Sequence, residues 1–385
     1  MERTSTTMSA ALSLLNPSPP QDLSLPAEIQ AYRDLPLEEL AERTEAAKHA
    51  LGDRVIVLGH NYQRDEVIRH ADIEGDSLKL SQIAAERSSH EYILFCGVHF
   101  MAETADILSK TGQTVILPDL AAGCSMADMA RIEQVDEAWD QLGRILPVEQ
   151  AVTPVVYVNS AAVLKAFCGE HGGITCTSSN AQRVIEWAWK RREKILFFPD
   201  EHLGRNTANK MGIPKEDLLV WDPFLPNGGH TPEAIQKARL LLWKGFCSVH
   251  QMFQPAHVRY FKEKHPGIKI IVHPECHEDV VNQADMSGST EFIIRTVSAA
   301  ASGSVWGVGT ELNLVNRLKQ RQPDKKIFFL SPTVCQCSTM FRIDAPHLCW
   351  AMENLAEGRV VNQISVPEDE KHWARIALQR MLDVS

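Results

Sequence analysis

The segment VHPECHED, residues 272–279, places two histidines, three acidic residues and one cysteine directly after a short apolar run. Imidazole and carboxylate groups are common general acids and bases, and with thiolates they also bind metals. Because alternate residues of an extended chain face the same side, His273 and Glu275 can act on one ligand. His277, Glu278 and Asp279 fit the start of a helix, where acidic residues are favourable. The segment alone is compatible with an acid/base site, a metal site or a solvated strand end.

Nine cysteines are spread along the chain, and no C-x₂-C pair occurs among them. An odd number in a large chain without a secretion signal argues against a disulfide framework, so most are expected to be small buried residues. Cys124 and Cys337 are different because they follow predicted strands, and Cys247 follows a glycine three residues before His250. Their thiolates can share one metal centre only if three similar units each present one cysteine at the same edge.

Short apolar runs that end in small or reactive residues recur along the chain, and we expect them to be strands. They lie in RVIVLGHNY (54–62), YILFCGVHF (92–100), TVILPDLAAGCSM (114–126), PVVYVNSAA (154–162), GITCTSSNA (173–181), KILFFPDEHLG (194–204), IKIIVHPEC (268–276), SVWGVGTELN (304–313) and KIFFLSPTVCQC (326–337).

Helical patterns alternate with these strands in residues 36–52, 76–89, 180–192, 231–244 and 309–320. Strands that are apolar on both faces and alternate with helices indicate an α/β fold with parallel sheets. Ligands of such folds bind beyond the carboxyl ends of the strands, where most of the reactive residues lie. One closed (β/α)₈ barrel and several smaller open sheets fit this pattern equally well.

The composition is that of a globular protein, with 44% hydrophobic and 23% charged residues. A net charge of -10 argues against a general nucleic-acid binder, and no apolar run reaches the roughly 20 residues of a membrane-spanning helix. We therefore expect neither nucleic acid nor a membrane as a partner, and a cytoplasmic location. Residues 1–36 are rich in Ser, Thr and Pro and are expected to form a mobile N-terminal tail.

Ten motifs in a fixed order resemble the quinolinate synthase family, an iron–sulfur enzyme family, between about residues 50 and 340. They are VLGHNYQRDEV, GDSLKLS, GVHFMAETADILS, YVNSAAVLKA, TSSNA, FFPDEHLGRNTA, WKGFCSVH, HPEC, GSTEFII and GVGTELNLVNRL.

The resemblance implies three α/β/α units with short parallel sheets, related by pseudo-threefold symmetry, with the active site at their central interface. The expected units are residues 37–146, 147–253 and 254–385, the last including a C-terminal segment. Each unit of the family contributes one cysteine to a single [4Fe-4S] cluster, which implies Cys124, Cys247 and Cys337 as ligands. Cys337 is preferred to Cys335 because the following STMFRID resembles the family's segment after its ligand.

The implied reaction condenses iminoaspartate with dihydroxyacetone phosphate to quinolinate, with loss of phosphate and water, in de novo NAD biosynthesis. Such a transferase forms a pyridine ring, and three cysteines on four irons leave one iron open as a Lewis acid. L-aspartate oxidase is the implied source of iminoaspartate.

The resemblance also implies the site residues. Glu275, Tyr157 and His273 are the expected catalytic groups, and they are also expected to contact substrate. The remaining expected substrate contacts are His60, Ser77, Asn159, Ser178 and Thr290.

Two other functions stay open at this stage. The first is a mononuclear zinc hydrolase that uses His273, Glu275 and His277 and needs no cluster. The second is an inactive relative, such as an iron-dependent regulator, that keeps only the scaffold. The sequence leaves undecided whether Cys335 and Cys337 form a disulfide, and what the N-terminal tail and the 217–235 region do.

Overall fold

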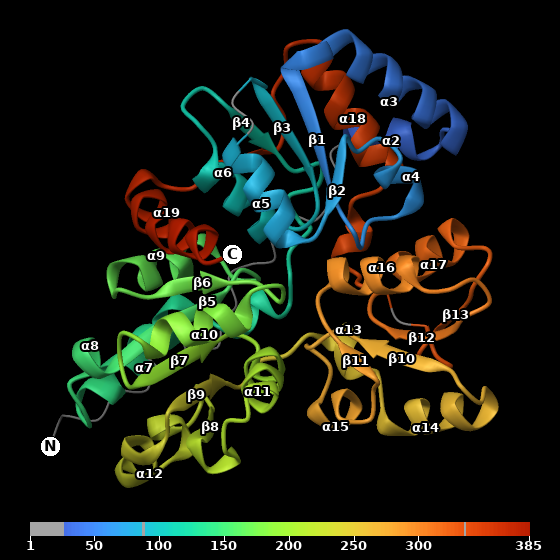
Figure 1. The fold of residues 1–385 in the computed structure, drawn as a ribbon. Helices are drawn as coiled ribbons and strands as arrows, with labels where there is room; N and C mark the ends of the chain where they lie inside the picture. Colours follow the sequence, from blue (N-terminus) through green and yellow to red (C-terminus); the bar gives the residue numbers. More distant parts are fainter. Residues whose placement is uncertain (1–26, 87–88, 335) are drawn as a thin grey trace, which may run out of the picture.

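The computed structural model describes residues 27–86, 89–334 and 336–385, and its strands form three separate open sheets (Figure 1). Neighbouring strands are parallel in all three sheets, except for one antiparallel pair in the first. The predicted α/β fold with several parallel sheets is therefore confirmed, and the single closed barrel is excluded for the described residues.

The first sheet has the strand order β14-β4-β3-β1-β2. Its strands are β1 (Val55–His60), β2 (Ile73–Gly75), β3 (Tyr92–Cys96), β4 (Thr114–Ile116) and β14 (Gln363–Ile364). Every residue of β1 and β3 is buried, because helices cover both faces of the sheet. Its main helices are α3 (Leu37–Leu51), α4 (Asp65–Ile68), α5 (Ser77–Glu86) and α6 (His99–Leu108).

The second sheet has the order β6-β5-β7-β9-β8. Its strands are β5 (Val152–Tyr157), β6 (Ile174–Cys176), β7 (Lys194–Phe198), β8 (Leu218–Trp221) and β9 (Leu240–Trp243). The helices around it are α7 (Ile132–Gly143), α8 (Val148–Ala151), α9 (Ala162–Glu170), α10 (Ala181–Trp189), α11 (Glu201–Lys210) and α12 (Pro232–Lys237). The apolar side of α7 packs into the same core as β5 and β7.

The third sheet has the order β11-β10-β12-β13. Its strands are β10 (Lys269–Val272), β11 (Met286–Ser287), β12 (Val305–Gly309) and β13 (Lys326–Phe329). The accompanying helices are α13 (Ser248–Gln251), α14 (Pro255–Lys264), α15 (Glu278–Val281), α16 (Thr290–Ala299) and α17 (Leu312–Arg321). Short 3₁₀ turns are η1 (Gly52–Arg54), η2 (Ala127–Met129), η3 (Lys215–Asp217), η4 (Pro226–Gly229) and η5 (Met340–Arg342).

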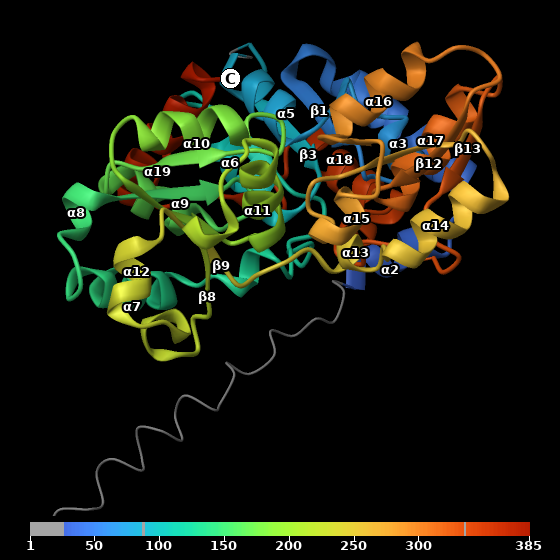
Figure 2. The same cartoon turned by 60° about the horizontal axis from the view of Figure 1, so that its bottom comes forward.

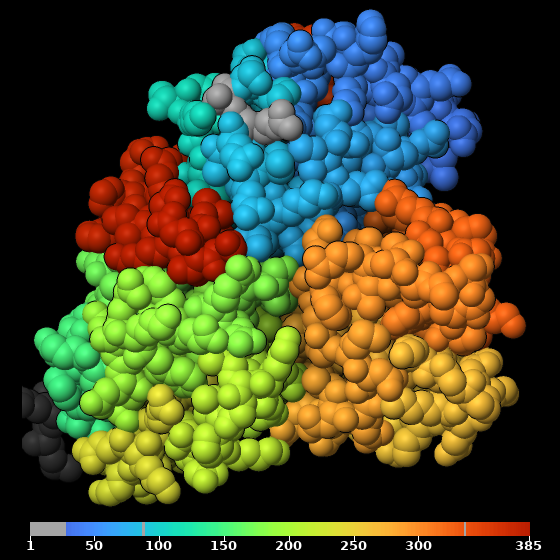
Figure 3. Space-filling view, viewed as in Figure 1, coloured from blue at the N-terminus to red at the C-terminus, as the bar shows by residue number. Residues whose placement is uncertain are grey.

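The chain returns from the third sheet to the first two through α18 (Ala345–Ala356) and α19 (Glu368–Asp383). Helix α18 packs against α3, and α19 packs against α9 and β6. The space-filling view shows α19 filling the junction between the first and second sheets' units (Figure 3). The predicted unit boundaries at 146/147 and 253/254 stay predictions.

Part of the predicted tail is ordered. Residues Ala27–Arg33 form α2, in which Ile29 is 1% exposed and Tyr32 donates a hydrogen bond to Glu353 of α18. Figure 2 gives a second view of the fold with α2 labelled, and the rest of the predicted tail, residues 1–26, lies outside the described residues. Because Ile29 is buried and Tyr32 is hydrogen-bonded to α18, residues 27–33 belong to the folded structure and not to a mobile tail.

The helix predicted over residues 231–244 is wrong in its second half. Thr231 caps α12 by accepting a hydrogen bond from the Ala234 N–H, but the helix ends at Lys237. The following LLLW forms β9, which pairs with β7 and β8 and is fully buried. Four consecutive apolar residues satisfy a buried strand as well as a helix, and the free backbone groups of the neighbouring strands decide between them.

Among the described residues, no helix combines the length and the apolar character that are needed to cross a bilayer.

The packing of α19 on α9 generates a stability prediction. A Cβ atom at Gly169 in α9 would lie 1.9 Å from the Trp373 carbonyl oxygen of α19, whereas one at Gly143 in α7 meets nothing closer than 3.6 Å. We expect Gly169→Ala to lower the free energy of unfolding by about 1–3 kcal/mol, because the two helices must separate. Gly143→Ala should be neutral or gain up to about 1 kcal/mol from helix propensity. Equal urea midpoints for the two variants would contradict this packing.

Candidate active site

One cavity at the centre of the molecule collects residues from all three sheets. It is lined by His60, Tyr62, Asp76, Ser77, Leu78, Val98, Phe100, Met101, Cys124, Met126, Tyr157, Asn159, Thr177, Ser178, Cys247, His273, Glu275, Thr290, Cys337, Thr339 and Met340. Every site residue implied by the family resemblance lies in this set. His60, Tyr157 and His273 end or directly follow β1, β5 and β10, so the carboxyl ends of the three sheets meet here.

Three thiols enter this cavity, one from the end of each sheet's unit. Cys124 follows β4, Cys247 is the N-cap residue of α13 after β9, and Cys337 lies between β13 and η5. Burial raises the pKa of Cys124 to about 12, and the nearby Cys337 adds to the effect. Burial likewise raises the pKa of Cys247, with contributions from Glu275, Cys124 and Cys337. The three thiols are therefore close enough to repel one another as thiolates, and a bound cation would remove that repulsion.

Glu275 holds the centre of the polar network. Tyr157 donates its phenol proton to Oε1 of Glu275 at 2.7 Å, and Nδ1 of His250 lies 2.7 Å from Oε2. Gln251, next to His250 in α13, donates to the Glu275 backbone oxygen at 2.9 Å. Both the Tyr157 and the Glu275 side chains are buried. The carboxylate is thus fixed by partners from the second sheet and from α13.

The charge states follow from burial and from these partners. Burial alone raises the pKa of Glu275, but His273, His250 and the hydrogen bonds from His250 and Tyr157 outweigh it, so its pKa is lowered. Burial and the adjacent Glu275 raise the pKa of Tyr157 well above its usual value. At neutral pH the pair is therefore a carboxylate and a phenol, which can exchange one proton with a bound molecule.

Two buried histidines flank this pair. Burial lowers the pKa of His60 and of His273 to about 3, so both are neutral at pH 7. His273 stacks on His250 with ring centroids 4.6 Å apart, and its Nε2 lies 3.2 Å from the Ser178 hydroxyl. Neutral imidazoles can donate or accept a hydrogen bond without adding charge to the site.

Hydroxyl groups that start helices surround the same cavity. Ser77 is the first residue of α5, Thr290 is the first residue of α16, and Ser178 lies in the turn before α10. Helix N-termini carry a partial positive charge and free N–H groups, which bind carboxylate and phosphate oxygens. Asn159 has a buried Oδ1 atom without a hydrogen-bond partner among the described residues. These groups suit an anionic ligand with several oxygens.

The zinc alternative fails on geometry. His277 has a 49% exposed side chain, and it caps α15 by accepting a hydrogen bond from the Asp279 N–H. The ligand atoms that do gather, within 4.8 Å of one another, belong to Cys247, His250 and Glu275. Sequence reasoning had correctly assigned His277 to a helix start, and the set His273, Glu275 and His277 forms no common site.

Sequence reasoning passed over Tyr62 and Thr310. The Tyr62 hydroxyl lies 2.8 Å from the Thr310 hydroxyl, which is also 3.3 Å from Nε2 of His250. Tyr62 follows His60 by two residues, just as Glu275 follows His273. The same i, i+2 spacing could therefore have predicted that Tyr62 lies on the side of His60.

Comparison with known proteins identifies the family of the chain. The family described as Quinolinate synthetase A protein matches residues 42–383. A quinolinate synthase of Herpetosiphon aurantiacus is 58% identical over 356 residues, which cover 92% of this chain and 95% of that protein. The quinolinate synthase of Rhodopirellula baltica is 56% identical, covering 92% and 93% of the two chains. That of Nocardioides sp. is 57% identical and covers 94% of each.

Among solved structures, a glyoxylate reductase from Paecilomyes thermophila aligns over 86% of this chain and 88% of that chain, at 12% identity. Its TM-score of 0.18 is too low to support a common fold. The assignment therefore rests on sequence: a family match from residue 42 to residue 383 and relatives that are more than half identical over nine-tenths of the chain. The chain belongs to the Quinolinate synthetase A protein family.

Proposed function

We propose that this chain is a quinolinate synthase, which condenses iminoaspartate with dihydroxyacetone phosphate and releases phosphate and water. The observation that carries the proposal is one cavity that joins three cysteines from three sheets' units to the Tyr157–Glu275 pair. The product then enters NAD biosynthesis, and L-aspartate oxidase is the proposed source of iminoaspartate.

The donor set fits an iron–sulfur cluster. Thiolates are the ligands of such clusters, and Cys124, Cys247 and Cys337 line one cavity and interact electrostatically. A [4Fe-4S] cluster held by these three residues would keep one iron without a protein ligand and would supply Lewis-acid chemistry for dehydration. His250 and Glu275 lie beside Cys247, with one ligand atom of each residue within 4.8 Å of the others.

The remaining steps belong to side chains. The helix starts at Ser77, Ser178 and Thr290 are proposed to bind the phosphate and carboxylate groups of the two substrates. Glu275 removes a proton from the condensing carbon or nitrogen, and Tyr157 returns one to a leaving oxygen. Phe100 and Met101 are 3% and 5% exposed and wall the cavity, so bulk water is kept from the reactive imine.

Iron analysis tests the cluster. Protein purified without oxygen should be brown, with about four irons and four sulfides per chain. Cys124→Ala, Cys247→Ala and Cys337→Ala should each lose the visible absorption, whereas Cys335→Ala should keep it. A colourless wild-type protein with one zinc, unaffected by these substitutions, would overturn the proposed function.

Tyr157→Phe tests the proton-transfer pair. The variant keeps the ring in place but removes the hydroxyl that donates to Glu275, so kcat should fall about 10²- to 10⁴-fold with the iron content unchanged. Tyr92→Phe is the matched control, because the Tyr92 hydroxyl contacts Arg54 and Glu91 and does not line the cavity. Full activity of Tyr157→Phe would remove the phenol from the mechanism.

The buried neutral histidines predict a pH effect on stability. Their pKa of about 3 in the folded chain lies below the unfolded value of about 6.5, so the unfolded state takes up protons first as the pH falls. Stability is then full above about pH 6.5 and declines toward pH 3, by about 1.4 kcal/mol per pH unit for each histidine. Urea unfolding of the apoprotein at pH 7.5 and 5.5 should show a shallower decline for His273→Gln than for wild type. The exposed-site variant His49→Gln should keep the wild-type slope, and equal slopes for all three proteins would contradict the assignment.

A further inference from the structure

The residues that follow His60 form an unusually dense connection between the first and third units. We define the NYQRD segment as residues 61–65. Asn61 donates to the Thr290 hydroxyl at 3.1 Å and to Glu291 at 3.2 Å, so it reaches the start of α16. Asp65 lies 3.1 Å from Nε of Arg317 in α17, and Arg317 in turn donates to the Asn61 and Gln63 backbone oxygens. The proposed mechanism uses no side chain of the NYQRD segment.

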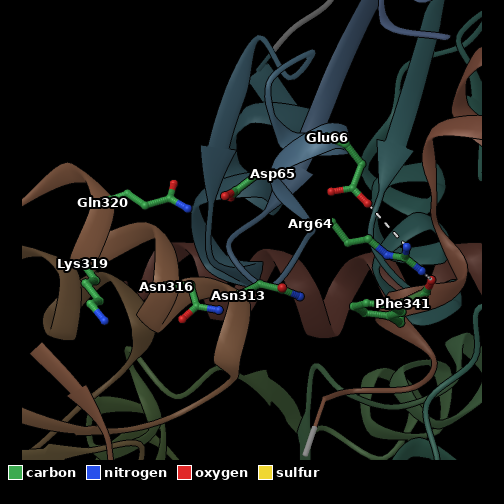
Figure 4. Close-up of a pocket in the computed structure, with 8 residues that line it drawn as sticks. All are labelled: Arg64, Asp65, Glu66, Asn313, Asn316, Lys319, Gln320 and Phe341. Atoms are coloured by element: carbon green, nitrogen blue, oxygen red, sulfur yellow. Dashed lines mark hydrogen bonds and ion pairs between the residues drawn. The ribbon is translucent and has the colours of Figure 1, made fainter. Parts of the chain in front are cut away.

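Two residues of the NYQRD segment contact the chain around Cys337. We define residues 336–342 as the Cys337 segment. The guanidinium of Arg64 lies over the Phe341 ring, with Cζ 3.4 Å from the ring centroid, and its Nη2 donates to the Phe341 backbone oxygen (Figure 4). Gln63 is fully buried, and its Nε2 lies 3.4 Å from the Met340 sulfur. Cation–π and hydrogen-bond contacts to one residue leave little freedom for that residue.

Phe341 is in turn coupled to the proposed cluster ligand. The Phe341 N–H donates to the Cys337 backbone oxygen at 3.0 Å, which closes a turn between them. The Cys337 thiol lies 3.4 Å from the Thr339 hydroxyl inside this turn. A displacement of Phe341 therefore moves the sulfur at position 337.

The Cys337 segment is anchored at its far end to the first unit as well. Arg342 donates from Nε to Oδ2 of Asp119 at 2.8 Å, and Asp119 precedes Cys124 in the loop after β4. From the third unit, Glu311 lies near this backbone: burial raises the pKa of the Glu311 carboxyl to about 7, and the backbone of Cys337 is among the groups that oppose this rise. The third sheet itself ends earlier, at Phe329 of β13. The position of this thiol thus depends on side chains of the first unit.

We propose that Arg64 is a positioning residue that clamps Phe341 and thereby fixes the Cys337 thiol at the central cavity. This inference rests on the proposed function, because it takes Cys337 as a cluster ligand. Loss of the clamp should free the segment, expose the thiol and speed the loss of iron, while the other two thiols keep their places.

If Arg64 only joined the two units, loss of another arginine between the same units should have the same effect. Arg321 of α17 forms a bidentate pair with Glu74 of β2, with distances of 2.7 and 3.0 Å. This pair also joins the third unit to the first, and no contact connects it to the Cys337 segment among the described residues. Arg321→Ala is therefore the matched control for loss of an inter-unit arginine.

The first measurement is thiol labelling of the full chain after iron removal. All variants carry Cys335→Ala, so that the tryptic peptide 327–342 contains one cysteine. In Arg64→Ala the rate of maleimide labelling at Cys337 should rise about tenfold or more, with less than a twofold change at Cys124, because only the local segment opens. Arg64→Lys should be intermediate, since lysine keeps the charge but lacks the planar stacking group. Arg321→Ala should label like the parent chain.

The second measurement follows the visible absorption of the iron-loaded proteins in the presence of a chelator. Arg64→Ala and Phe341→Leu, which weaken the same clamp from opposite sides, should both bleach faster than Arg321→Ala. Unchanged labelling of Cys337 in both clamp variants would overturn the proposal, as would an equal rise at Cys124 and Cys337, which indicates general unfolding. A parent chain that binds no iron would instead refute the proposed function, and the labelling result would still test the clamp.

Discussion

A buried carboxylate is the constraint on which the centre of this molecule depends. Removing a carboxylate from water costs several kcal/mol, so Glu275 can stay charged only where donors are already fixed around it. Tyr157 at the end of β5 donates to Glu275, which follows β10, and Nδ1 of His250 in α13 lies 2.7 Å from the other carboxylate oxygen. The Glu275 carboxylate therefore helps to fix the second and third sheets relative to each other. A displacement of either unit would leave that charge buried without its partners.

The same centre must receive anions, although it already contains a carboxylate and three thiols. The helix starts at Ser77, Ser178 and Thr290 supply the opposite sign of potential, because free N–H groups gather at the ends of α5, α10 and α16. Because His60 and His273 are neutral, this balance is left to the helices and, under the proposed function, to the iron–sulfur cluster. The carboxyl ends of the three sheets thus place groups that repel an anion, the carboxylate and the thiols, beside helix N-termini that attract it, and these groups come from different units.

The sequence predicted the longer, fully buried strands well, because the largely apolar runs of β1, β5 and β7 are typical of strands inside a parallel sheet. It did not predict β9, because LLLW suits a helix until neighbouring strands exist. It also did not predict that α18 and α19 return to the first and second units, since an amphipathic pattern shows that a helix has a partner but not which one. For the site, residue patterns alone located reactive groups at strand ends. Only the family resemblance selected Cys337 or Ser178 from many similar residues.

The packing of the three units is unequal, and this bears on how the buried centre is reached. One apolar core runs through the first and second sheets and includes α18, and it contains no residue of the third sheet. The third sheet has its own cores, and Tyr62 of the first unit packs against one of them. Its contacts with the first unit also include the polar ones of Asn61, Asp65 and Arg321. Polar contacts exchange for water at a net cost of about 1 kcal/mol each, whereas apolar surface costs about 25 cal/mol for every Å² exposed. The junction of the third unit with the first is therefore less costly to loosen than the apolar junction of the first with the second, whereas separation of the third unit from the second would break the buried hydrogen bond between Tyr157 and Glu275.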